Sequence, residues 1–168
     1  FSNIPQTYTD LKIVLSFRGT VTSGNDPYDL IFTLNSTSTI SSKVLRGDGS
    51  IVSNNSITDR ILRAGATPSD WTASTFSNVE IYIPNYTSST YKSWSADGVV
   101  ENNATISAQA LIAGLTSITA PVTSITLAAL AGNLATYSTA TLYGVRNAAK
   151  VMGNSLKATG GDVTFDGT

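Results

Sequence analysis

The chain lacks cysteine and histidine altogether, and only two of its 168 residues, Glu80 and Glu101, are glutamates. Without cysteine and histidine it cannot build a Ser-His-Asp triad, a Cys-His pair or a thiolate metal site. Disulfides are also excluded, so packing, strand pairing or oligomerisation must supply the stability. We therefore expect a protein that is not an enzyme and that holds no cofactor or metal.

Charge is scarce as well. Charged residues make up 12% of the chain, and the net charge is −1, whereas roughly 25% charged residues is usual. The ten Lys and Arg residues are scattered and form no stripe that could follow a phosphate backbone. No apolar run approaches the ~20 residues needed to cross a bilayer. The sequence predicts no nucleic-acid partner and no membrane insertion.

The chain is rich in hydroxyl side chains, with 22 serines and 24 threonines, and 41% of its residues are hydrophobic. A chain of this length can bury about two-thirds of its unfolded surface around one core. Threonine and the β-branched aliphatic residues suit pleated, half-buried strands. These features predict a β-rich domain whose wettable surface consists mainly of uncharged hydroxyls and amides.

Alternation of apolar and polar residues marks the expected strands. The clearest alternation runs from Asp10 to Arg18, where every second residue from Leu11 to Phe17 is apolar. The same pattern covers residues 28–35 and 78–83, and both segments are predicted strands with one buried face. Residues 106–113 also fit a strand, although their Ala and Leu content would permit a short helix; we favour the strand.

Two further candidate strands are 124–130 and 135–146. Clusters of Gly, Asn, Asp and Pro separate the runs and predict turns at 19–27, 47–50, 54–55, 84–85, 97–98, 102–103 and 132–133. Residues 57–74 are expected to form a long loop at the sandwich edge. Seven or eight short strands without an amphipathic helix predict an all-β fold, an antiparallel β-sandwich of jelly-roll-like form with an extended C-terminal arm.

The amino-acid composition changes after Arg146. Residues 147–161 are small, polar and aperiodic, which is typical of a linker or an arm. We therefore expect a sandwich domain over residues 1–146. The remaining residues, 147–168, would be a linker or arm leading to a further region or a neighbouring subunit. Within that arm, Asp162–Phe165 resembles a strand that begins a further region or is donated to another subunit.

Three motifs have possible chemistry. Glu80 with Asp97 or Glu101 could form the carboxylate pair of a glycoside hydrolase, but we favour the simpler explanation, a glutamate on a polar strand face and a carboxylate in a turn. Residues 89–92 match Ser-x-x-Lys, which requires the first turn of a buried helix. Residues 47–50 resemble part of a calcium loop but lack its further carboxylates; a tight turn is favoured.

Aromatic residues gather around the predicted strand at 78–83 and its loops. Exposed rings stack on sugar faces or anchor protein partners, whereas buried rings fill a sandwich core. Most of these rings are expected in the core. If a ligand is bound, the candidate binding residues are the loop aromatics and amides Trp71, Asn85, Tyr86 and Trp94.

Several segments resemble one known class of protein. Phe1–Leu11 (FSNIPQTYTDL), Thr75–Tyr86 (TFSNVEIYIPNY), Glu101–Thr105 and Tyr137–Val145 are similar to minor structural and tail-fibre proteins of bacteriophages, especially cyanophages. Residues 157–168 resemble the lead-in to the glycine-rich distal region of such fibres. The resemblance implies a virion component that is assembled in the host cytoplasm and then exposed on the particle surface. It transfers no catalytic residue.

Three functions remain open at this point. The first is a tail-fibre or appendage module that forms a homo-oligomer, with a trimer as one form, and contacts other virion proteins and a host surface glycan. The second is a capsid decoration, or cement, protein that clamps neighbouring shell subunits. The third is a carbohydrate-binding β-sandwich domain outside any virus.

Overall fold

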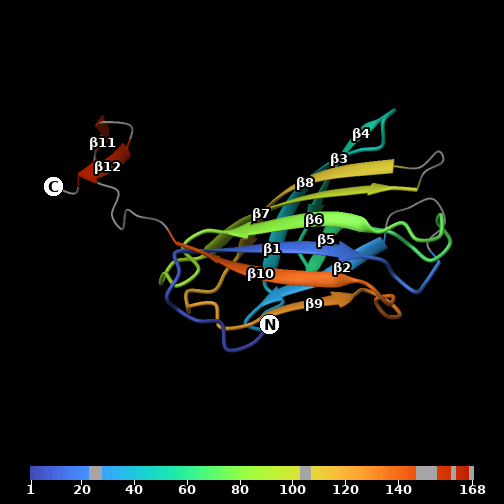
Figure 1. Cartoon of the computed structure of the whole chain (residues 1–168), viewed down its shortest axis with the longest axis horizontal. Coiled ribbons are helices and arrows are strands. Elements are labelled where there is room, and N and C mark those ends of the chain that lie inside the picture. The colour runs from blue at the N-terminus through green and yellow to red at the C-terminus, as the bar shows by residue number, and fades with distance from the viewer. Residues whose placement is uncertain (23–27, 103–106, 147–154, 160–161, 167–168) are drawn as a thin grey trace.

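The computed structural model describes residues 1–22, 28–102, 107–146, 155–159 and 162–166, and these residues contain strands but no helix. Ten strands build two antiparallel sheets, which lie one against the other (Figure 1). The strands are β1 (Asp10–Phe17), β2 (Tyr28–Leu34), β3 (Ile40–Gly47), β4 (Val52–Ile57), β5 (Ile61–Ala66), β6 (Ser77–Ile83), β7 (Lys92–Glu101), β8 (Ser107–Thr116), β9 (Ile125–Ala129) and β10 (Thr139–Val145). The predicted all-β sandwich is confirmed.

The larger sheet has seven strands in the order β10-β1-β6-β7-β8-β3-β4, and the smaller has the order β5-β2-β9. One face of the larger sheet supplies most of the core. Val79, Ile81 and Ile83 of β6 are completely buried, and the smaller sheet adds Phe32 and Leu34 of β2 to the same cluster. Removing these apolar faces from water is the main driving force for stacking the two sheets.

The clearest sequence predictions are confirmed strand by strand. In β1 the four alternate apolar residues from Leu11 to Phe17 are all buried. β2 lies within the predicted segment 28–35, and β6 begins one residue before the predicted segment 78–83 and ends with it. The segment that could have been a short helix is strand β8, and its first predicted residue, Ile106, lies outside the described residues. β9 and β10 lie within 124–130 and 135–146.

The sequence predictions missed four strands, β3, β4, β5 and β7. As a result, two predicted turns and one predicted loop were wrong. The predicted turns at 54–55 and 97–98 lie inside β4 and β7, and the predicted loop 57–74 contains β5. In β7 the inward side chains lack an apolar pattern because they include a lysine and a glycine: Lys92, Trp94, Ala96, Gly98 and Val100. Pairing with β6 and β8 on either side makes this segment a central strand.

Gly98 is required where the two sheets approach each other. A Cβ atom at this position would lie 1.9 Å from the backbone carbonyl oxygen of Ala64 in β5. The absence of a side chain therefore lets β5 lie directly against β7. The glycine that suggested a turn in the sequence instead marks a close contact between the sheets.

The predicted tight turn at 47–50 is confirmed. The Asp48 carboxylate accepts hydrogen bonds from the backbone N–H groups of Ile51 and Ser50, both at 2.8 Å. These bonds lower the pKa of Asp48 from its ordinary value, because they stabilise the charged carboxylate. Gly49 adopts a φ of 91°, which suits a residue without a side chain. The loop therefore uses its carboxylate to close a turn.

In the C-terminal arm, β11 (Ser155–Thr159) pairs with β12 (Asp162–Asp166) as a two-stranded antiparallel sheet. β12 covers the predicted strand at 162–165, and its partner belongs to the same chain. The other residues of the predicted linker, 147–154 and 160–161, lie outside the described residues.

Candidate functional site

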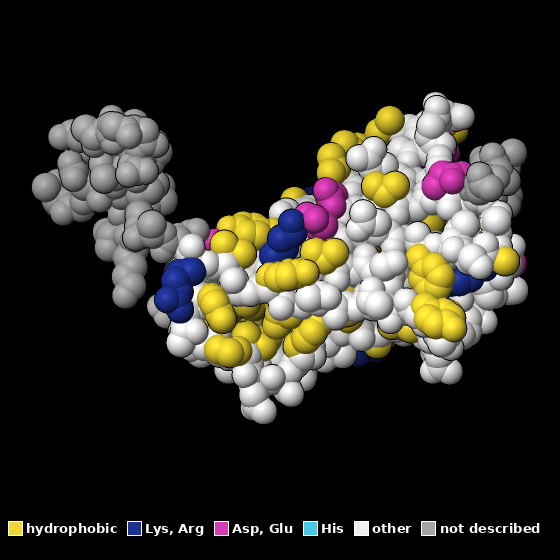
Figure 2. Space-filling model, in the orientation of Figure 1, with side chains coloured by type: hydrophobic (Ala, Val, Ile, Leu, Met, Phe, Trp, Pro, Cys, Tyr) yellow, Lys and Arg dark blue, Asp and Glu magenta, His cyan; other side chains and the backbone are white. Residues whose placement is uncertain are grey.

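The outward face of the larger sheet carries an open hollow of about 750 Å³, which we call the outer-face trough. It crosses six neighbouring strands of the sheet, in the order β1, β6, β7, β8, β3 and β4. Figure 2 shows basic and acidic side chains adjacent to each other in a hollow of this surface. The lining residues are Lys12, Lys43, Val44, Leu45, Asn54, Glu80, Ile81, Tyr82, Ser95, Ala96, Asp97, Leu111, Ile112 and Ala113.

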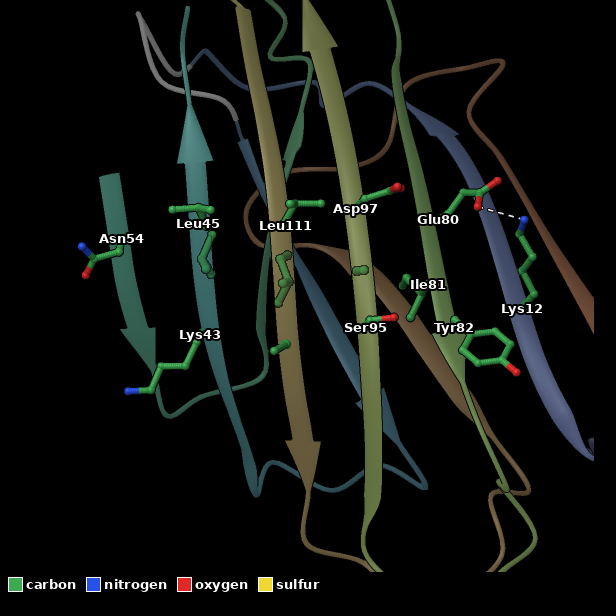
Figure 3. A pocket seen from close by; sticks show the side chains of 14 residues that line it. Lys12, Lys43, Leu45, Asn54, Glu80, Ile81, Tyr82, Ser95, Asp97 and Leu111 are labelled. Carbon is green, nitrogen blue, oxygen red and sulfur yellow. Dashed lines mark ion pairs between the residues drawn. The ribbon is translucent and has the colours of Figure 1, made fainter. Parts of the chain in front are cut away.

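Strand register arranges the outward side chains of the trough in two parallel rows. One row follows the pairs Asn54–Leu45, Leu45–Leu111, Leu111–Asp97 and Asp97–Glu80. The other row is formed by Lys43, Ala113, Ser95, Tyr82 and Lys12. With strands about 4.8 Å apart and two residues between rows, the trough is about 24 Å long and its rows are about 7 Å apart. Its long axis crosses the strands (Figure 3).

Three of the four charged side chains in the trough are already bonded. Lys12 Nζ lies 2.8 Å from Glu80 Oε2, and these side chains are 40% and 46% exposed. Lys43 Nζ donates a hydrogen bond to Ser56 Oγ. The Asp97 carboxylate, by contrast, has no hydrogen bond or ion pair with any residue that the structure describes. Asp97 is therefore the charged side chain of the trough that bonds to no other described residue.

Tyr82 stands at the β6 side of the trough in a fixed orientation. Its hydroxyl donates a hydrogen bond of 2.5 Å to Asp10 Oδ2, and the other carboxylate oxygen of Asp10 accepts the backbone N–H of Asn85 at 2.9 Å. The hydrogen bond to Asp10, together with burial and the nearby negative charge, raises the pKa of Tyr82 to about 12. The ring remains 40% exposed, so an aromatic edge is held in place at the trough.

Of the four binding residues predicted from sequence, Asn85 alone is exposed. It lies in the turn after β6, with a φ of 48°, and its backbone bond to Asp10 ties that turn to Tyr82. Asn85 does not line the trough. The predicted turn at 84–85 is confirmed. The side-chain amide of Asn85, however, lies apart from the residues that line the trough.

The predicted aromatics Tyr86 and Trp94 are buried, and Trp94 belongs to β7 instead of a loop. The Trp94 ring packs edge-on against Phe32 with centroids 5.0 Å apart, and it covers Gly114, where a Cβ would lie 2.1 Å from the ring. The hydroxyl of Tyr86 donates to the backbone oxygen of Pro5. These rings fill the core and have no free face for a ligand.

Trp71 is also buried, in the connection between β5 and β6. The Arg18 guanidinium holds this connection by donating to the backbone oxygens of Ser69, Trp71, Thr72 and Thr75 at 2.7–3.0 Å. A charged donor bonded to several carbonyls keeps a loop in one conformation. Trp71 therefore packs inside the fold in this structure. The sequence analysis expected this of most of the aromatic residues.

The fold brings Glu80 and Asp97 directly opposite each other on β6 and β7. Glu101 lies four residues farther along β7, about 14 Å away at strand spacing. A glycoside hydrolase needs one carboxyl kept protonated by its surroundings and another kept ionised. Glu80 is bound to Lys12 and Asp97 faces water, so neither side chain has the apolar surroundings of a general acid.

The Ser-x-x-Lys match at residues 89–92 lies in a loop and the start of β7, and not in the first turn of a helix. Lys92 Nζ donates to the backbone oxygens of Ser88 and Thr90 at 2.7 and 2.6 Å. Burial lowers the pKa of Lys92 from its ordinary value. The lysine closes its own loop, and Ser89 is exposed.

Sequence reasoning missed most residues of the trough, including Lys12, Lys43, Leu45, Asn54, Ser95 and Leu111. Each of these residues is an ordinary outward strand position. Only the register between six strands shows that they form one surface, so the sequence offers no local signal for them. The acidic residues Glu80 and Asp97 were singled out, but their proximity follows from the pairing of β6 with β7.

The fold and this surface define an antiparallel β-sandwich with an open trough on the outside of its larger sheet. Comparisons with family models, with curated proteins and with solved structures gave no significant match. In the described part of the chain, no three His, Cys, Asp or Glu residues gather where they could hold a metal ion. The same residues include no helix with the length and hydrophobicity of a membrane span.

Proposed function

We propose that this chain is a structural and binding module on the surface of a bacteriophage particle, of the tail-fibre or appendage class. It assembles with other virion proteins as a homo-oligomer and presents the outer-face trough to a receptor on the host. The observation that carries this proposal is an uncovered trough of about 750 Å³ across the outside of the sheet. The resemblance of Phe1–Leu11 and the later segments to phage structural proteins supplies the virion context.

The trough suits binding better than catalysis. Its two carboxylates lie on an open, solvated face, and one of them is neutralised by Lys12. The low content of charged residues, 12%, fits a surface that avoids non-specific attraction. Weak contacts at such a face become strong when several copies of the module bind together.

A capsid decoration protein is the second candidate, and one observation favours it. Beside the trough, a second hollow of about 460 Å³ is bordered by the exposed apolar residues Leu45, Val52, Val99 and Leu111. Contiguous exposed apolar side chains are typical of surfaces that contact other proteins. A shell subunit could cover this end of the sheet.

Quantifying the chain in purified particles tests the proposal. We expect the chain to be present, at a few oligomers per particle, and an antibody against it to label the tail in electron micrographs. Hundreds of copies distributed over the head would support the decoration protein instead. Absence of the chain from the particles would refute both virion roles and favour a carbohydrate-binding domain outside any virus.

A further inference from the structure

We propose that the outer-face trough binds a linear oligosaccharide of uncharged sugars, which lies across the strands and donates hydroxyl hydrogen bonds to the Asp97 carboxylate. This inference rests on the proposed function, because it names the receptor chemistry that the exposed module would recognise. It depends on the shape of the trough, its unpaired polar groups, its apolar surfaces and its charge.

The shape of the trough favours a chain over a single small molecule. Six strands contribute to a hollow about 24 Å long whose two rows of side chains stand about 7 Å apart. Two small side chains, Ala113 and Ser95, form the middle of one row between the longer Lys43 and Tyr82. Figure 3 shows the labelled side chains spread across neighbouring strands of the sheet. A ligand that fills it must be long, narrow and of similar cross-section throughout.

A peptide fits this surface poorly. Extended peptides usually bind sheets along an edge, where free backbone groups pair with their main chain. Across the face of the sheet, the backbone groups of β7 and β8 already bond to neighbouring strands on both sides. The trough therefore offers a ligand side chains alone, and it has no deep pocket for a side-chain anchor. A sugar chain, with hydroxyls along both edges, needs neither feature.

Three polar side chains in the trough are free to bond a ligand. The Asp97 carboxylate, the Ser95 hydroxyl and the Asn54 amide make no side-chain hydrogen bond within the described residues. A carboxylate forms stronger hydrogen bonds with hydroxyl donors than a neutral acceptor does. Asp97 also lies within one of the two rows, between Leu111 and Glu80. We therefore assign the main polar contact to Asp97.

Apolar surfaces flank these polar groups. Leu45 and Leu111 are 50% and 53% exposed, and the Tyr82 ring is held in place by the bond from its hydroxyl to Asp10. The C–H faces of sugar rings pack on such side chains, and a ring that is already fixed loses little conformational freedom when a ligand binds. The trough therefore offers both apolar and polar groups, which match the two kinds of surface on a sugar.

The charge distribution selects against acidic glycans. Glu80 pairs with Lys12. Lys43 bonds to the neutral Ser56 hydroxyl and keeps its charge, but it lies on β3, two strands away from Asp97 on β7, so the negative charge of Asp97 has no basic partner beside it. Sulfated or uronic sugars would place a second negative charge beside it, which is unfavourable. Uncharged sugars avoid this repulsion and still offer hydroxyl donors.

Titration of the full chain with neutral linear oligosaccharides tests the proposal, using cello-, malto- and manno-oligosaccharides from the disaccharide to the hexasaccharide. We expect at least one series to bind with an affinity that rises with chain length. Asp97→Asn should weaken that binding about tenfold or more. Asp59→Asn, an exposed carboxylate outside the trough, is the matched control and should leave the affinity unchanged.

A second variant, Ala113→Trp, fills the floor without changing the charge of the trough and should abolish binding. Circular dichroism of each variant keeps a folding defect separate from a binding defect. Binding of heparin or alginate in place of neutral chains, equal binding by Asp97→Asn, or cleavage of the oligosaccharide would overturn the inference. If no glycan binds but the chain is still found on particle tails, the inference fails while the proposed function stands.

Discussion

The two faces of the seven-stranded sheet share one backbone but have different surroundings. On β7 the inward residues from Lys92 to Val100 are buried, and the outward residues between them are exposed. The inward face meets the smaller sheet, so shape and volume constrain its residues. The outward face meets water, so polar, charged and apolar residues are all tolerated there. This difference predicts a graded series of mutational effects.

The largest effect is expected from a charge on the inward face. Ile81→Asp, and equally Leu15→Asp, would place an unpaired carboxylate at a buried position. The cost of several kcal/mol approaches the whole stability of a domain, so we expect no folded protein. Chemical denaturation measured by circular dichroism tests this. Asn78→Asp, on the outward face of the same strand, is the control and should fold normally.

A smaller loss is expected at the close contact between the sheets. Gly98→Ala would place a methyl group 1.9 Å from the Ala64 carbonyl oxygen, so a strand must shift. Overpacking of this kind costs about 1–3 kcal/mol, which urea unfolding would detect. The outward substitution Ser95→Ala on the same strand should change stability by less than about 0.5 kcal/mol. Equal stability of the two variants would show that the contact between β5 and β7 is not tight.

A substitution at Tyr82 should have an intermediate effect on stability, because the ring faces outward while the hydroxyl bonds to the buried Asp10. Tyr82→Phe removes one hydrogen bond and should cost about 1 kcal/mol at neutral pH. Thermal denaturation of the two proteins measures this loss. A variant as stable as the wild type would contradict a stabilising role for the bond.

The same pair of proteins makes a prediction about alkaline pH. The folded state raises the pKa of Tyr82 from 10.0 to about 12, which favours the protonated hydroxyl. Its contribution to stability is therefore complete below pH 10 and is lost as the pH rises through about 12. The stability difference between wild type and Tyr82→Phe should shrink over that range. A constant difference would rule out the Asp10 bond as its source.

The smallest effect is expected for the ion pair on the outward face. Glu80→Gln breaks the contact with Lys12, but both side chains are more than a third exposed and screened by water. Such pairs contribute about 0–1 kcal/mol, so we expect a change below about 0.5 kcal/mol that vanishes in 1 M salt. Complete loss of receptor binding in this variant would indicate that Glu80 has a direct role in function.

The strands with the clearest sequence pattern were those whose buried face is made of large aliphatic residues. Residues 10–17 and 77–83 alternate regularly, and both are central strands with a buried face. β7 alternates just as strictly in burial, but its inward face includes Lys92, Ala96 and Gly98, which look polar or neutral in sequence. Those residues are buried because neighbouring strands and β5 surround them, which no local pattern encodes.

The residues of the candidate site were likewise only partly predictable from sequence. Sequence reasoning singled out Glu80 and Asp97 as carboxylates of interest, and the register of β6 with β7 places them opposite each other. It also selected Trp71, Tyr86 and Trp94 as candidate binding residues, and the fold buries all three. A large ring is equally suited to a core and to a binding surface. Composition alone therefore could not choose between the two.

Local sequence was sufficient to establish an all-β sandwich and the positions of its most regular strands, because a two-residue period of apolar side chains specifies a strand with one buried face. The location of the trough depends on register, since six strands from distant parts of the chain must align before their outward residues form one surface. Such long-range pairing also determined which aromatic rings are buried and why position 98 must be glycine.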